Sequence, residues 1–219
     1  MLTIYGVYRS RASRNIWLAN ELGLSFKHVP VTQHYRLGDA TAPGAPLNTR
    51  SPEFLKVNPN GHIPSIDDDG LILHESLAIN LYLAKKHGGP IAPATLAEDG
   101  ETGMWALWAA TEVEPHALMV IYHRLGGAPG GVKDPAIADA AVAALRGPFA
   151  VLDRALAKTG FLVGDRFTVA DINAAEIVRY AQPAPELFDA NPRVKAWLTA
   201  CQARPAFRKM WEARDKEPA

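Results

Sequence analysis

The sequence has very little cysteine. Its 219 residues contain one, Cys201, so an intramolecular disulfide is impossible and no Cys-x-x-Cys redox or zinc motif exists. Cys201 lies in the segment WLTACQARP, which has a helical pattern, and a small buried residue is the expected role of this thiol. The composition therefore excludes a disulfide scaffold and favours a reducing compartment.

Long apolar runs and an excess of either charge are also lacking. No stretch approaches the roughly 18 consecutive apolar residues of a membrane-spanning helix, and the start MLTIYGV does not have the features of a signal peptide. Lys and Arg number 23, as do Asp and Glu, so no net charge attracts nucleic acid or an anionic membrane. We expect a soluble, cytoplasmic protein with neither of those partners.

The first part of the chain alternates strand and helix patterns. Residues 2–7 are rich in β-branched and aromatic side chains and predict a strand. Apolar residues then recur at helical spacing up to Gly23, and residues 25–31 predict a second strand. A strand–helix–strand unit of about 30 residues implies two parallel strands joined by a right-handed crossover.

A proline in an unusual position follows an irregular loop at 33–53. In NPNGHIPSI, residues 58–66, Pro64 stands at the start of a predicted strand, where it cannot donate to a β ladder. Such a position indicates either an ordinary turn or a functional site. Asp69-Gly70 then predicts a hairpin between two short strands, and residues 76–87 predict a helix with basic residues in its last turn.

The rest of the chain is predicted to be helical. A linker rich in Pro and Gly at 88–97 separates residues 1–87 from residues 98–219, in which strand patterns vanish. Pro115 is expected to kink a helix or to begin a new one, and Thr168 with Asp171 predicts a capping box. The order predicts an α/β domain with a βαβ–ββα arrangement, followed by an all-helical domain.

This organisation resembles the glutathione S-transferase family over the whole chain. Four motifs carry the resemblance: NPNGHIPSI at 58–66, HES at 74–76, FLVGDRFTVADI at 161–172 and YRSRASRNIWLANELGL at 8–24. The last is similar to the first helix of bacterial, serine-type, theta-like members. The resemblance implies a thioredoxin-like domain that binds glutathione as co-substrate, an all-α C-terminal domain and a homodimer.

The resemblance also assigns the glutathione-binding residues. In the family the proline that matches Pro64 is cis, which turns the N–H and C=O of Ile63 outward to pair with the cysteinyl backbone of glutathione. Glu75 and Ser76 match the residues at the γ-glutamyl end, where the N–H groups of a helix N-terminus bind anions; a plain N-cap is the alternative for Ser76. His62 matches a position near the glycyl end, with a solvated turn histidine as the alternative.

The catalytic residue is expected near the start of the first helix. A thiol of pKa about 8.5 needs a hydrogen-bond donor and positive potential to ionise at neutral pH, and a helix N-terminus supplies both. The serine-type pattern S-x-x-x-R gives Ser10 the thiol-binding role and Arg14 a structural or electrostatic one. Ser13 and Tyr8 also carry hydroxyls and remain alternatives, and Arg11 could add positive potential beside the thiolate.

The second substrate is expected against the kinked helix of the helical domain. Trp105, Trp108, Glu112 and His116 lie there, and the last three are four residues apart and share one face. A stripe of core or dimer packing is the alternative. We expect no metal site, because one histidine with flanking glutamates falls short of a ligand set.

The leading hypothesis is a glutathione transferase in which Ser10 stabilises the thiolate that attacks a small hydrophobic electrophile. A glutathione-dependent isomerase, dehalogenase, or peroxide or disulfide reductase could use the same fold. The lack of a cysteine near the first helix argues against the cysteine-type reductases. A non-catalytic binding or adaptor protein predicts a ruined site, whereas Pro64, Glu75 and Ser76 are all present.

Overall fold

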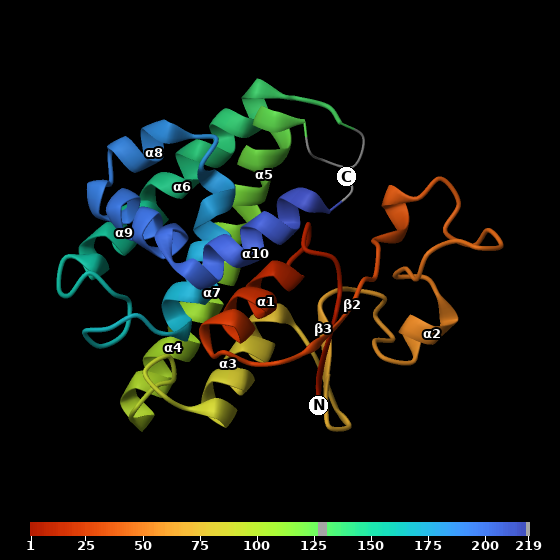
Figure 1. Cartoon of the computed structure of the whole chain (residues 1–219). Helices are drawn as coiled ribbons and strands as arrows, with labels where there is room; N and C mark the ends of the chain where they lie inside the picture. The colour runs from red at the N-terminus through yellow and green to blue at the C-terminus, as the bar shows by residue number, and fades with distance from the viewer. Residues whose placement is uncertain (127–130, 218–219) are drawn as a thin grey trace. The chain divides into compact units, whose positions relative to one another are not determined.

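The computed structural model describes residues 1–126 and 131–217, and the chain forms two compact units (Figure 1). The first unit contains Met1–His87 and the residues from Pro205 onward, and the second contains Gly88–Arg204. The predicted linker at 88–97 therefore begins the second unit.

The first unit is built on a four-stranded sheet in the order β2-β1-β3-β4. The strands are β1 (Leu2–Tyr5), β2 (Lys27–Val29), β3 (Ser65–Asp68) and β4 (Leu71–His74). β1 and β2 are parallel, whereas β3 is antiparallel to both β1 and β4. With α1 (Ala12–Glu21) between β1 and β2, and α3 (Ser76–His87) after β4, this arrangement confirms the predicted βαβ–ββα order.

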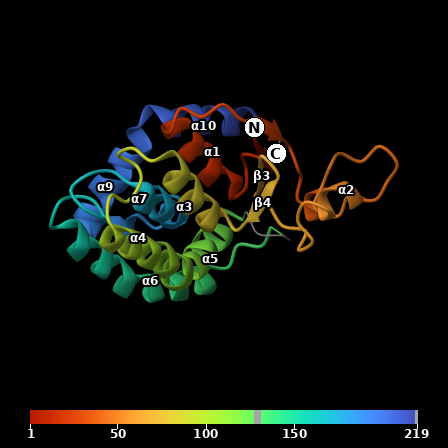
Figure 2. The same ribbon diagram turned by 90° about the horizontal axis from the view of Figure 1, so that it is seen from below.

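The hairpin turn of this unit lies at two residues with positive φ values. Asp69 and Gly70 have φ values of 54° and 93° and join β3 to β4, as the hairpin signal predicts. Figure 2 shows β3 and β4 side by side near α3. The long irregular segment before them contains a short 3₁₀ helix, η1 (His34–Arg36), and the four-residue α2 (Pro52–Leu55).

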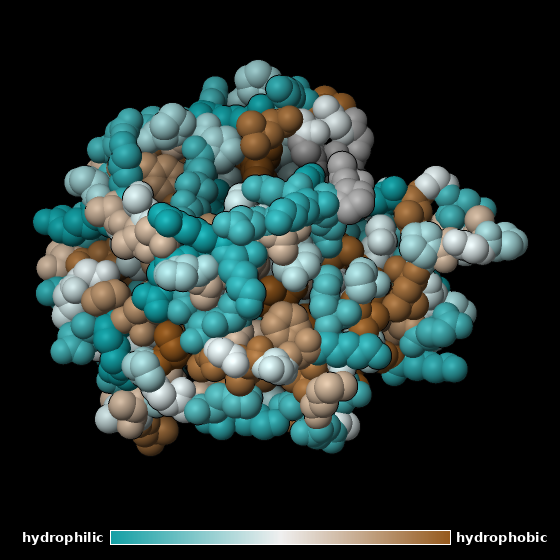
Figure 3. Space-filling view, viewed as in Figure 1, coloured by the Kyte–Doolittle hydropathy of each residue, from teal (hydrophilic) through white to brown (hydrophobic). Residues whose placement is uncertain are grey.

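The last helix, α10 (Pro205–Lys216), packs along α1 in the first unit, although its pattern groups it with the other helices (Figures 1 and 2). The rings of Trp17 and Phe207 meet edge to face with centroids 5.0 Å apart, and Phe207 stacks on Trp211. Phe207 and Met210 are buried, while the opposite side of α10 is charged and exposed. Hydrophilic side chains accordingly predominate over α10 in Figure 3. Helical periodicity reveals the apolar stripe of such a helix but not the unit that buries it.

The second unit is all-helical. Its elements are α4 (Leu96–Trp108), a π-helical segment η2 (Ala109–Val113), α5 (Glu114–Leu125), α6 (Pro135–Leu156), α7 (Val169–Val178), a 3₁₀ turn η3 (Arg179–Ala181), α8 (Pro185–Asp189) and α9 (Pro192–Ala203). A new segment begins beside Pro115, as expected, but the local distortion is a π-helical turn rather than a simple proline kink. Every residue of α7 is buried, which makes it the centre of this unit.

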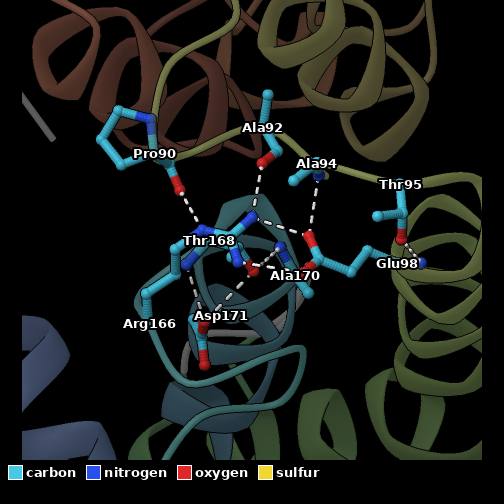
Figure 4. Close-up of polar contacts among 9 residues, drawn as sticks. All are labelled: Pro90, Ala92, Ala94, Thr95, Glu98, Arg166, Thr168, Ala170 and Asp171. Atoms are coloured by element: carbon cyan, nitrogen blue, oxygen red, sulfur yellow. Dashed lines mark hydrogen bonds and ion pairs between the residues drawn. The ribbon is translucent and has the colours of Figure 1, made fainter.

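The linker is held by side chains within the second unit (Figure 4). The Arg166 guanidinium pairs with both carboxylate oxygens of Glu98, at 3.0 and 2.6 Å, and also donates to the carbonyl oxygens of Pro90 and Ala92. Thr95 caps α4 by accepting from the Glu98 N–H at 3.1 Å. This cap explains why the helix begins at Leu96, inside the predicted linker.

The predicted capping box of α7 is present. Thr168 Oγ1 accepts from the backbone of Ala170, and an Asp171 carboxylate oxygen accepts from the Thr168 N–H at 2.9 Å. The other Asp171 oxygen accepts from Leu162 N and from Trp197 Nε1. One carboxylate therefore ties the loop before α7 and helix α9 to the start of α7.

One described helix, α6, is long and apolar enough to cross a membrane by length and composition, although no unbroken apolar run of that length occurs. It packs against α5 and α9 in the second unit, where Phe149 and Leu152 are fully buried. The apolar side chains of α6 therefore contribute to the core of that unit.

Candidate functional site

The strand register brings the loop after β1 next to Ile63. Tyr5 pairs with Ser65 in the antiparallel β1–β3 ladder, so residues beyond Tyr5 face residues before Ser65. Between them lies Gly6, with φ of 142°, where an added Cβ would lie 2.8 Å from the Ala12 Cβ and 3.4 Å from that of Ile63. Glycine is needed for this approach. The entrance of α1 and the Ile63–Pro64 bond are therefore neighbours.

The Ile63–Pro64 peptide bond is cis, as the family resemblance implies. Pro64 is buried, Ile63 is partly exposed and His62 is exposed. Ile63 lies just before β3, outside the strand pairings, so its backbone is placed at the end of the ladder rather than within it. Backbone groups that lie outside the strand pairings can instead bond to an extended peptide, as in the addition of a strand.

Asn58 organises the turn that precedes this bond, a role that the sequence motif did not assign to it. It is buried, and its Nδ2 donates to the His62 carbonyl at 2.8 Å and to Ser65 Oγ at 3.2 Å. Gly61 adopts φ of 60°, and a Cβ there would lie 2.7 Å from the carbonyl oxygen of Thr49. The turn therefore requires both the amide of Asn58 and a glycine at 61.

Glu75 and Ser76 form the junction between β4 and α3. Glu75 is exposed and has a φ of 72°, a conformation that non-glycine residues rarely adopt and that is often found at functional sites. Its carbonyl accepts from Ile79 N, so the helical hydrogen bonds start there. Ser76 is buried, and Arg14 Nη1 donates to its hydroxyl at 3.0 Å.

Arg14 belongs to a buried polar cluster that joins α1 to α3. Asn15 Nδ2 donates to the Ser76 carbonyl at 2.8 Å and to Asn80 Oδ1 at 2.7 Å, and Asn80 Nδ2 donates to the Arg14 carbonyl. All four side chains are buried. We did not single out Asn15 or Asn80 from the sequence, although two amides on the apolar faces of two predicted helices were a usable signal.

Ser10 lies at the entrance of α1 and is partly exposed. Its hydroxyl donates to the Val7 carbonyl at 2.6 Å and accepts from Ala12 N at 3.0 Å. The side chain is therefore held at the helix N-terminus, where unpaired N–H groups and the helix dipole favour an anion.

The two alternative hydroxyls lie in different surroundings. Ser13 is fully buried inside α1. Tyr8 turns toward β2 and α10: its ring meets that of His28 edge to face at 4.9 Å, and it lines a shallow pocket with Phe26 and Lys209. Burial, and then the charge of Glu217, raise the pKa of Tyr8. Arg11 is exposed at the start of α1.

The predicted second-substrate residues lie in the helical unit, around the π-helical segment. The structure brings Trp105 and Trp108 together edge to face, with centroids 5.1 Å apart. Trp105 is buried, Glu112 is exposed and Trp108 and His116 are intermediate. Within the described residues, no group of three or more His, Cys, Asp or Glu side chains could hold a metal ion.

Comparisons with known proteins agree with this architecture. Residues 4–91 match the model of the glutathione S-transferase N-terminal domain, and residues 113–205 match that of the C-terminal domain. Glutathione S-transferase 3 of Zea mays is 36% identical over 95% of this chain and 92% of its own length.

Solved structures give the same result. Glutathione transferase F7 from Populus trichocarpa has a TM-score of 0.83 at 30% identity and covers 98% of this chain and 99% of its own. A glutathione S-transferase I bound with lactoylglutathione has a TM-score of 0.82 at 26% identity over 97% and 99% of the two chains. The curated relative and the F7 structure come from plants and give no support to the bacterial, theta-like resemblance. The chain belongs to the glutathione S-transferase family.

Proposed function

We propose that this protein binds glutathione in its first unit and activates the thiol for attack on a small hydrophobic electrophile. The observation that carries the proposal is that three features lie in one unit: the cis bond at Ile63 beside the end of a β ladder, the start of α3 at Ser76 and the start of α1 at Ser10. A related solved structure supports the binding of glutathione, since it holds lactoylglutathione.

Each feature matches one part of the tripeptide. The backbone of Ile63 is placed to pair with the cysteinyl residue as an added strand. The N-terminus of α3, with the buried Arg14 guanidinium behind Ser76, favours the carboxylate of the γ-glutamyl residue. Glu75 is exposed beside it and can meet the ammonium group, and the exposed His62 is the proposed contact of the glycyl end.

Ser10 is the proposed donor to the thiolate, and its chemistry is serine-type. In the structure its hydroxyl donates to the Val7 carbonyl, so the O–H must rotate away from Val7 to reach the sulfur. The bond that it accepts from Ala12 N can persist during this rotation and keeps the oxygen in place. Ser13, which is fully buried, and Tyr8, which turns toward α10, are less suited to the role.

The second substrate and the assembly complete the proposal. The pair of Trp105 and Trp108, with Glu112 and His116, is the proposed source of contacts to the electrophile. We also propose a homodimer, as the family resemblance implies, and a cytoplasmic location without a metal, as the composition and the incomplete ligand set indicate. Conjugation is preferred to isomerisation, dehalogenation or reduction as the first activity to assay.

The test combines binding with turnover. Calorimetry should show saturable glutathione binding, and a panel of electrophiles should show conjugation that depends on Ser10. The matched variants Ser10→Ala, Ser13→Ala and Tyr8→Phe each remove one hydroxyl, and only the first should lower kcat/KM, by about 10²-fold or more. Absence of saturable glutathione binding would overturn the proposal, and an unchanged rate in Ser10→Ala would overturn the assignment.

A further inference from the structure

The carboxylate of Glu217 holds the loop that leads to Ser10. One oxygen accepts from the Tyr8 N–H at 2.8 Å and the other accepts from the Arg9 N–H at 2.7 Å. These residues are about 210 positions apart in the sequence, yet both lie in the first unit. Two successive N–H groups on one carboxylate form a charge-assisted, bidentate contact, which is stronger than a neutral hydrogen bond.

The carbonyl groups of the same two residues are also held from outside the loop. Arg214 Nη1 donates to the Tyr8 carbonyl at 2.7 Å, and Arg36 Nη2 donates to the Arg9 carbonyl at 3.0 Å. Arg9 Nε in turn donates to the Arg214 carbonyl at 3.3 Å. Both backbone groups of Tyr8 and both of Arg9 are therefore bonded, and the end of α10 supplies three of the four partners.

The end of α10 is itself fixed by an aromatic stack. Trp17 of α1 meets Phe207, Phe207 stacks on Trp211, and the Arg214 guanidinium lies 5.0 Å from the centre of the Trp211 ring. This stack runs from the buried face of α1 to the residue that bonds Tyr8. Because a closely packed neighbour shifts little, the backbone conformation of the loop depends on the packing of α10 and not only on the sequence of the loop itself.

We propose that Glu217 is a positioning residue for the thiol-activating hydroxyl of Ser10. The inference rests on the proposed function, in which Ser10 donates to the thiolate. Ser10 directly follows Arg9, and its oxygen has to lie within hydrogen-bond distance of a sulfur that other elements hold. Displacement of a reacting group by about 1 Å can cost a hundredfold in rate, so a clamp on the preceding peptide groups affects catalysis without touching the substrate.

The two possible effects of replacing Glu217, the loss of its charge and the loss of the loop position, change the pKa of the bound thiol in opposite directions. A carboxylate near the sulfur disfavours the thiolate, so removal of its charge alone would lower the pKa of the bound thiol. Loss of the loop position weakens the Ser10 hydrogen bond and would raise that pKa. The other charged or titratable groups around the loop are Tyr8, Arg9, His28, Arg36, Lys209 and Arg214, and the variants replace none of them.

The experiment uses Glu217→Gln and Glu217→Asp in the full chain, with Glu212→Gln as the matched control on the exposed side of α10. Glutamine keeps the shape but turns one acceptor into a donor that opposes an N–H group, and aspartate keeps the charge but is one methylene shorter. The pH profile of kcat/KM for the electrophile is measured for each at saturating glutathione, where its inflection reports the bound thiol, together with thermal unfolding. We expect both variants at 217 to lose about tenfold in kcat/KM and to shift the thiol inflection upward by about half a unit.

The outcomes separate the two proposals. If the wild-type protein is active, two results for Glu217→Gln would overturn the positioning role and leave the proposed function intact. One is a rate and pH profile equal to those of wild type, and the other is a thiol inflection at lower pH than in wild type. Wild-type protein without any conjugation would overturn both. Unchanged kinetics in Glu212→Gln and a similar unfolding temperature in all four proteins would tie the effect to the loop.

Discussion

The guanidinium of Arg14 lies 3.0 Å from the hydroxyl of Ser76, and the two residues are only 1% and 6% exposed. The contact joins the first helix to the start of the third, across 62 residues of sequence. A buried cation directly behind a helix N-terminus strengthens the positive potential that an incoming carboxylate meets. The proposed glutathione site therefore depends on a residue that does not need to touch glutathione.

Replacement of Arg14 by methionine should weaken glutathione binding and the fold together. Methionine fills much of the volume but provides neither the charge nor the bond to Ser76. We expect the dissociation constant for glutathione to rise by about tenfold or more, and the free energy of unfolding to fall by about 2–3 kcal/mol. Calorimetry and urea unfolding measure the two effects. Arg208→Met, on the exposed side of α10, is the control and should change neither quantity.

Gly6 should not tolerate even a methyl group. In Gly6→Ala the new Cβ would lie 2.8 Å from that of Ala12 at a φ of 142°, so the entrance of α1 must move away from Ile63. We expect a loss of about 2–4 kcal/mol in unfolding free energy and weaker glutathione binding. Gly100→Ala in α4 has open space around it and should instead stabilise the protein by about 0.5–1 kcal/mol. A neutral result for Gly6→Ala would refute the close approach.

Removal of the buried Asp171 carboxylate should be among the most destabilising single substitutions in the helical unit. In Asp171→Ala, the N–H groups of Leu162 and Thr168 and the Trp197 Nε1–H all lose a buried acceptor. Each unsatisfied donor costs about 1–3 kcal/mol, so a total loss of at least about 3 kcal/mol is expected in urea unfolding. Asp165→Ala, an exposed neighbour, should have almost no effect.

The ion pair of Glu98 and Arg166 should make stability depend on pH in acid. The hydrogen bonds from Arg166, followed by that from the Ala94 N–H, lower the pKa of Glu98 from 4.5 to about 2. Because the folded state depresses this pKa, the stabilisation is fully present above pH 4.5 and is lost as the pH falls toward 2. Glu98→Gln should therefore be less stable than wild type at neutral pH, and the difference should vanish near pH 2. A difference that stays constant with pH in thermal unfolding would contradict this, and the exposed Glu101→Gln serves as control.

Much of the first unit could be predicted because local signals and tertiary structure agree there. Gly23 and Gly70 mark the end of α1 and the turn between β3 and β4, so the βαβ–ββα order of elements along the chain could be predicted. The motif around Pro64 implied the cis bond through its resemblance to the family. The capping box at Thr168 could be predicted for the same reason, since its pattern is local.

Long-range polar contacts could not be predicted from the same patterns. Asn15 and Asn80 meet only after α1 and α3 have packed, and Glu217 reaches Tyr8 only because α10 returns to α1. Helical periodicity carries no information about which unit a helix joins. The cap at Thr95 was a missed local signal, since a threonine followed three residues later by Glu98 is a capping pattern.

The central claim is that Ser10 lowers the pKa of the bound glutathione thiol. The direct test is an ultraviolet absorbance titration of the thiolate in complexes of glutathione with wild type, Ser10→Ala and Ser13→Ala. The account predicts a thiol pKa well below the ordinary value of about 8.5 in wild type and in Ser13→Ala, and a return toward that value in Ser10→Ala. A wild-type value in the Ser10→Ala complex, or a rise that occurs only in Ser13→Ala, would contradict it.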